Sequence, residues 1–123
     1  MADYHENIFS EEESKVIEAF SFAINKKDFF LSKDQLAGIE SKFSDEKVSG
    51  WVFAYNAYQL SNQERIRLLK SNMHNSNPRI REQVCDIVGD ECISDLRQDL
   101  KELFGDHVSY VSQAAKYNHD EMF

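Results

Sequence analysis

Three carboxylates in the middle of the chain have a spacing that would bring them together. Glu82, Asp86 and Asp90 follow one another at intervals of four residues, so on a helix they form a row along one face. Like charges at this spacing destabilise a helix by a few tenths of a kcal/mol per pair. The row therefore indicates either a solvated face or a surface that receives a basic partner.

The residue types that serve nucleophilic or metal chemistry form no known motif. No two histidines stand four residues apart, as in zinc-binding helices, and the four glycines are isolated, which excludes a glycine-rich phosphate loop. A pair of Cys85 or Cys92 with His107 is left open, against the alternative of reduced, packed thiols. The adjacent Glu12 and Glu13 are better explained by helix capping than by acid–base catalysis. We therefore expect no enzyme, no metal ion and no cofactor.

The helix that would carry the acidic row is well marked in the sequence. Asn77 can cap a helix N-terminus, and Pro78, the only proline, suits the first helical position because its missing N–H needs no partner there. An apolar stripe at the helical period follows, made of Ile80, Val84, Ile87 and Val88. Gly89 is expected to end this helix.

Capping signals predict further helices on both sides. The expected starts are three capping boxes, Ser10 with Glu13, Ser32 with Gln35 and Ser61 with Glu64, and two single caps, Ser44 and Asp106. The apolar linker 29–31 is expected to plug the core between two helices. No sustained period-two alternation occurs, so we expect an all-α fold of about seven helices and no sheet.

The helices are expected to repeat in pairs. Sliding the chain on itself aligns Val48 with Ile80 at an offset of 32, and Ile80 with Val111 at an offset of 31. The predicted organisation is one helical domain, 1–123. It contains an N-terminal capping helix at 10–27, helix pairs at 33–60, 62–89 and 92–118, and a frayed tail at 119–123.

The segment Pro-x-Ile-Arg-x-x-Val, from Pro78 to Val84, resembles the second helix of a HEAT-type repeat, whose usual form is Pro-x-Val-Arg-x-x-Ala. The resemblance covers 61–118 and departs in the last pair, where Ser109 and Ser112 replace Pro and Arg. It implies a short HEAT-like α-solenoid, with an irregular helical bundle as the alternative. In such arrays the motif arginine, here Arg81, joins ladders between repeats, and the second helices line a concave binding surface.

The repeat offsets predict which side chains adjoin the acidic row. They place Tyr117 beside Asp86, Tyr110 beside Arg79, and Tyr58 and Glu121 beside Asp90. The expected partner-binding residues are Glu82, Asp86, Asp90, Tyr58, Tyr110, Tyr117 and Glu121. Tyrosines among carboxylates suit a basic protein surface, and the alternative for the tyrosines is partial burial at helix edges.

Charge restricts the classes of partner. The net charge is −8, so non-specific binding to nucleic acid is not expected. Residues 61–81 carry five bases against one acid, and we expect these bases to pair internally. No apolar run approaches the roughly 20 residues that span a membrane, and the first residues lack the pattern of a signal peptide. A cytoplasmic protein without membrane contact is therefore expected.

A small, acidic, HEAT-like domain without catalytic residues resembles the bacterial toxin-immunity proteins of contact-dependent growth inhibition and related polymorphic toxin systems. The resemblance implies that the chain binds a cognate toxin and blocks its active site. The expected toxin is a nuclease domain, whose basic cleft an acidic surface would match. The alternative is a non-catalytic helical-repeat adaptor or scaffold in a larger complex.

Overall fold

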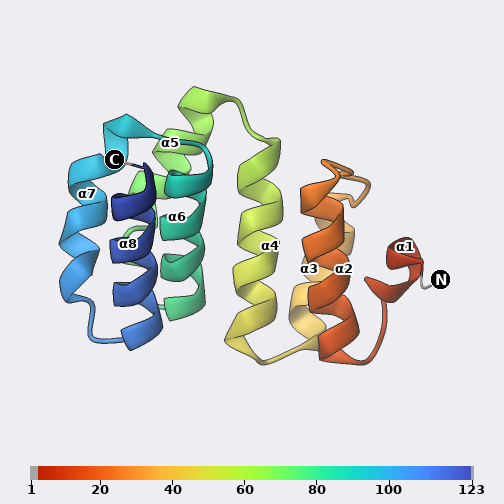
Figure 1. The fold of residues 1–123 in the computed structure, drawn as a ribbon. Coiled ribbons are helices and arrows are strands. Elements are labelled where there is room, and N and C mark those ends of the chain that lie inside the picture. Colours follow the sequence, from red (N-terminus) through yellow and green to blue (C-terminus); the bar gives the residue numbers. More distant parts are fainter. Residues whose placement is uncertain (1–2, 123) are drawn as a thin grey trace. The chain divides into compact units, whose positions relative to one another are not determined.

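The computed structural model of this protein describes residues 3–122, which form eight α-helices and two short 3-10 helices without a β-strand (Figure 1). The elements are α1 (Tyr4–Asn7), α2 (Glu13–Asn25), α3 (Lys33–Lys42), α4 (Glu46–Gln59), α5 (Asn62–Ser71), α6 (Pro78–Asp90), η1 (Ser94–Leu96), α7 (Arg97–Glu102), η2 (Leu103–Gly105) and α8 (Ser109–Met122). The predicted all-α class is confirmed. The choice between a HEAT-like stack and an irregular bundle stays a prediction.

The chain divides into two compact units, residues 1–59 and 60–123. The first contains α1 to α4, and the second contains α5 to α8. The predicted helix pairs 62–89 and 92–118 fall in the second unit. The organisation as one domain stays a prediction. None of the described helices is both long and apolar enough to cross a membrane.

The first unit is built around Tyr55, a fully buried side chain of α4. Its hydroxyl accepts a hydrogen bond of 2.8 Å from the backbone N–H of Leu31, and its ring meets those of Phe20 and Phe29 edge-on. Burial raises the pKa of Tyr55, because apolar surroundings disfavour the phenolate. The linker 29–31 therefore packs into the core, as its sequence predicted.

Helix α6 is the centre of the second unit. It packs against α8 and also contacts α7, and Figure 1 shows α6 and α8 side by side. The fully buried apolar side chains of these three helices include Val84, Ile87, Val88, Leu100, Val111 and Ala115. The apolar stripe read from the sequence is thus the buried side of α6, apart from Ile80, which is half-buried.

Two of the predicted helix starts are confirmed in full. Ser32 forms a capping box with Gln35, each side chain bonding the other's backbone N–H. Asn77 caps α6 by accepting from the N–H of Arg79 at 2.8 Å, with Pro78 at the first helical position. Both signals are local in sequence, which is why they could be read without knowledge of the fold.

Other starts differ from the prediction. Ser61 caps α5, but its hydroxyl also donates to the carboxylate of Glu64, which does not return to the Ser61 backbone as a capping box requires. The box expected at Ser10 is wrong, because its hydroxyl accepts from the N–H of Glu12 and α2 begins only at Glu13. The cap expected at Ser44 is replaced by the carboxylate of Asp45, which accepts from the N–H of the second helical residue.

Four further differences concern the extent or existence of helices. Helix α6 continues one residue past Gly89, to Asp90. The helix expected from about 92 is broken into η1, α7 and η2, and the short helix α1 was not predicted. Helix α8 continues through Met122, so the described part of the predicted tail is helical, and Phe123 lies outside the described residues.

Candidate protein-binding face

Only a narrow strip of the surface of helix α6 is exposed to solvent. Of its thirteen residues only Asp86 and Asp90 are exposed, and Glu82 is half-buried one turn earlier. The side chains on the other sides are buried or half-buried. The acidic row therefore forms the solvent-facing strip of the helix, as the spacing of four predicted.

Helix α8 lies beside α6 and runs in the same direction. Near the start of both helices the guanidinium carbon of Arg79 lies 3.9 Å from the ring centre of Tyr110. Further along, the Asn118 side chain donates a hydrogen bond of 2.9 Å to Asp86. These contacts join residues 31 and 32 apart, so the predicted neighbourhood of Arg79 and Tyr110 is confirmed. Asp86 contacts Asn118, one residue beyond the Tyr117 that the repeat offset named.

The Arg79 side chain contacts two of the predicted partner-binding residues, Tyr110 and Glu82. Its guanidinium covers the half-buried ring of Tyr110 and forms an ion pair of 3.1 Å with Glu82. The side chains of Arg79 and Glu82 are 30% and 25% exposed. The negative charge of the row is thus offset at Glu82.

The carboxyl group of Asp86 is in an environment that disfavours its charge. Desolvation by the surrounding protein raises its pKa, and the negative charges of Glu82 and Asp90 add to that rise, while the hydrogen bond from Asn118 lowers it. The side chain as a whole remains exposed. Asp86 is therefore an exposed carboxyl group whose pKa is raised by its surroundings and lowered by one amide donor.

The remaining predicted residues occupy different surroundings. Tyr117 is 65% exposed on α8, and Glu121 is exposed one turn later. Tyr58 is half-buried in α4 of the first unit, so its place beside Asp90 stays a prediction. We use the term α6–α8 face for the surface of the second unit formed by Glu82, Asp86, Asp90, Tyr110, Tyr117 and Glu121.

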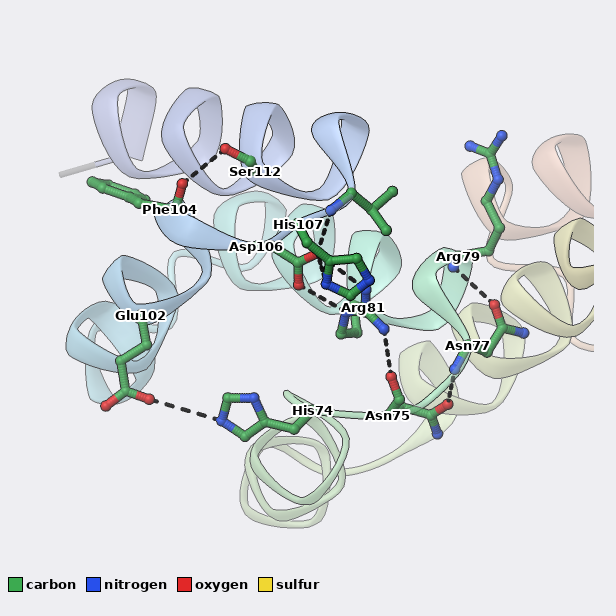
Figure 2. Close-up of polar contacts among 11 residues, drawn as sticks. His74, Asn75, Asn77, Arg79, Arg81, Glu102, Phe104, Asp106, His107 and Ser112 are labelled. Carbon is green, nitrogen blue, oxygen red and sulfur yellow. Dashed lines mark hydrogen bonds and ion pairs between the residues drawn. The ribbon is translucent and has the colours of Figure 1, made fainter.

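A buried ion pair fixes the loops at one end of these helices (Figure 2). Arg81 contacts Asp106 through two hydrogen bonds of 2.8 and 3.0 Å, and its third nitrogen donates to the backbone carbonyl of Asn75 at 2.8 Å. Asp106 also accepts from the N–H of Val108 at 3.0 Å. The Arg81 hydrogen bonds lower the pKa of Asp106. Arg81 therefore ties α6 to the loops that precede α6 and α8.

Internal pairing, expected for the bases of 61–81, is confirmed for most of them. Besides Arg79 and Arg81, the buried Arg65 donates to the carbonyl of Leu60 at 2.7 Å, and Lys70 lies 3.6 Å from the carboxylate of Asp99. These bases serve the second unit itself.

The two cysteines have opposite surroundings. Cys85 is fully buried, and desolvation, with the charges of Asp86, Asp106 and Glu82, raises its pKa far above the usual range. Its thiol is held in the neutral form, which is a poor nucleophile. Cys92 is exposed and both thiols are free. Its backbone is left-handed, with φ 50°, at the turn that follows α6.

A second polar cluster, in the first unit, was not anticipated. Asp28 accepts from the Tyr4 hydroxyl at 2.5 Å and lies 2.6 Å from Nε2 of His5, whose ring lies 4.1 Å from that of Phe30. The Tyr4 bond, and then the His5 bond, lower the pKa of Asp28. No spacing in the sequence links these residues, and only the packing of α1 on α2 brings them together.

Within residues 3–122 no three side chains of His, Cys, Asp or Glu lie where they could hold one metal ion. A shallow depression on α5 is lined by Leu60, Glu64, Arg67, Leu68 and Ser71. Comparisons with known proteins give no match among family models, curated proteins or solved structures.

Proposed function

We propose that this protein is an immunity protein that binds a cognate bacterial toxin domain, a nuclease in the expected case, and covers its active site with the α6–α8 face. One observation carries the proposal. The central helix α6 is buried or half-buried on its other sides and is exposed only at Asp86 and Asp90. A nuclease presents a basic cleft to its substrate, and this strip is complementary to it in charge.

The charge of the face is concentrated toward the C-terminal ends of its helices. The charge of Glu82, near the start of α6, is offset by Arg79, whereas Asp86 lies one turn later on α6 and the exposed Glu121 lies near the end of α8. A cluster of this sign accelerates the association of a basic partner and makes the association rate depend on salt. Affinity must come from groups that lose water on binding.

Tyr117 is the residue best suited to that role. Its ring is 65% exposed on α8, and an aromatic ring adds large apolar area to an interface at a small cost in side-chain entropy. Arginine, the residue that nucleases use against phosphate, both stacks on an aromatic ring and pairs with a carboxylate. The face thus offers a partner arginine a ring and neighbouring anions.

The test is a binding and protection assay with the chain's own partner. The tagged protein is purified from its own cells, a co-purifying basic protein is identified, and the toxicity of that protein is measured with and without this chain. Tyr117→Ala is expected to raise the dissociation rate at least tenfold, and Glu121→Lys to lower the association rate. Both variants are expected to weaken protection.

Glu18→Lys is the matched control, because it makes the same charge change at an exposed site on α2. If all three variants protect as well as the wild type, the α6–α8 face is not the interface. Several partners in substoichiometric amounts, none of them toxic, would instead favour a helical adaptor.

A further inference from the structure

Asn118 is a buried polar side chain that crosses from α8 to α6. It is 8% exposed, and its amide nitrogen donates to Asp86 at 2.9 Å and to the backbone carbonyl of Ala114 at 2.8 Å. The two hydrogens of the amide are thus both used, which fixes the orientation of the group. Its oxygen is directed toward Gly89, where an added Cβ would lie only 2.0 Å from it. A glycine at 89 is what makes room for the Asn118 side chain.

The hydrogen bond from Asn118 lowers the pKa of Asp86, whereas the other influences raise it. Desolvation and the anions of Glu82 and Asp90, on the same helix, favour the neutral acid, and the Asn118 hydrogen bond favours the anion. On α8 the titratable residues that flank Asn118 are Tyr117 and His119, followed by Asp120 and Glu121, and the group of α8 that shifts the pKa of Asp86 is Asn118. The amide is therefore the group on α8 that supports the charge of Asp86.

The chemical type of the donor matters for the face. A lysine or arginine at 118 would also stabilise the Asp86 anion, but it would cancel its charge, as Arg79 does at Glu82. An amide donates a hydrogen bond and leaves the full negative charge in place. Asparagine thus orients the carboxyl group and lowers its pKa without adding a positive charge beside it.

We propose that Asn118 is a positioning residue of the α6–α8 face, which holds the Asp86 carboxyl group in a fixed orientation for a cationic group of the partner. The inference rests on the proposed function, because it assigns a role within that surface. It adds a buried residue to a site whose other members are exposed or half-buried.

The first measurement is the titration of Asp86, followed by its carboxyl NMR signal, in the wild type and in Asn118→Ala. Loss of the hydrogen bond is expected to shift the titration of Asp86 to higher pH. Binding of an oligo-arginine peptide at low ionic strength is measured over the same pH range, and its midpoint is expected to shift upward in parallel. Gln98→Ala, at an exposed site on α7, is expected to change neither.

An exchange of the two side chains separates positioning from mere folding. In the double variant Asp86→Asn with Asn118→Asp the hydrogen bond is restored with donor and acceptor reversed, so stability is expected to recover relative to Asn118→Asp alone. The charge then sits at the buried position, and peptide binding is expected to remain weak. Recovery of binding together with stability would overturn the proposal.

The experiment also distinguishes this inference from the proposed function. If the wild type binds the peptide and Asn118→Ala shifts neither midpoint, the positioning role is refuted while the binding face stands. If the wild type does not bind the peptide but Asn118→Ala still shifts the Asp86 titration, the electrostatic basis of the proposed function fails while the control of Asp86 by Asn118 is supported.

Discussion

Replacing Asp106 with alanine is expected to lower the free energy of unfolding by about 3–5 kcal/mol. The carboxylate accepts two hydrogen bonds from Arg81 and one from the N–H of Val108, and the two charged side chains are only 8% and 7% exposed. Two charge-assisted bonds contribute about 1.5–3 kcal/mol each. The variant also leaves a buried guanidinium whose remaining hydrogen bond is to the carbonyl of Asn75.

The assay is urea unfolding followed by far-UV circular dichroism, for Asp106→Ala, Arg81→Met and the double variant. The double variant should cost clearly less than the sum of the two single changes, because it leaves no unpaired charge. Arg79→Met is the matched control two residues away. It breaks a partly exposed pair and a ring contact, and a loss of about 1 kcal/mol is expected.

The pH dependence gives a second check on the same pair. The Arg81 hydrogen bonds lower the pKa of Asp106 in the folded state. Its contribution to stability is therefore fully present above the ordinary carboxyl pKa and is lost as the pH falls through the lowered value. The difference between the wild type and Asp106→Ala should shrink over that acidic range. A loss at pH 7 no larger than that of Arg79→Met, or additive single changes, would refute the reasoning.

Three further predictions follow from other contacts. Gly89→Ala should lower the melting temperature, because overpacking against Asn118 costs about 1–3 kcal/mol. The control Gly38→Ala, where an added Cβ meets nothing within 4 Å, should stabilise the protein by about 0.5–1 kcal/mol. Equal shifts of the melting temperature in the two variants would contradict the α6–α8 contact. Asp28 has a lowered pKa, so protection of the α1 amides from hydrogen exchange should be lost as the pH falls through it, and Asp28→Asn should lose it already at neutral pH. A thiol reagent should label Cys92 in the native protein and Cys85 only after unfolding, and two rapidly labelled thiols per native chain would disprove the burial of Cys85.

Sequence reasoning succeeded where a helix signal is contained within a few residues. Asn77 with Pro78, and Ser32 with Gln35, specify their caps locally, and both caps form. It failed at Ser10, because a serine hydroxyl can bond several nearby backbone groups. Here it accepts from the N–H of Glu12 in a turn and does not cap the helix. The four-residue helix α1 is too short to show any periodicity.

The neighbours of the candidate site could be predicted only where the spacing between α6 and α8 equals the offset of 31 residues read from the sequence. An offset of 31 gave the contact of Arg79 with Tyr110. At the other end of the helices the contact shifts by one residue, so that Asn118 rather than Tyr117 bonds to Asp86. A buried asparagine in a helix has the same sequence signal as an exposed one, and its importance follows only from the tertiary contact.

Because most of α6 is buried or half-buried, substitutions in this one helix have two different effects. Changes at its buried positions act on folding, whereas changes on the solvent-facing strip alter the charge of the surface. The pattern of charge on the strip can therefore drift while the fold is retained. A lineage built on this scaffold would be free to exchange one partner for another, and Asp86, tied to Asn118, would be the slowest of the three acidic positions to change.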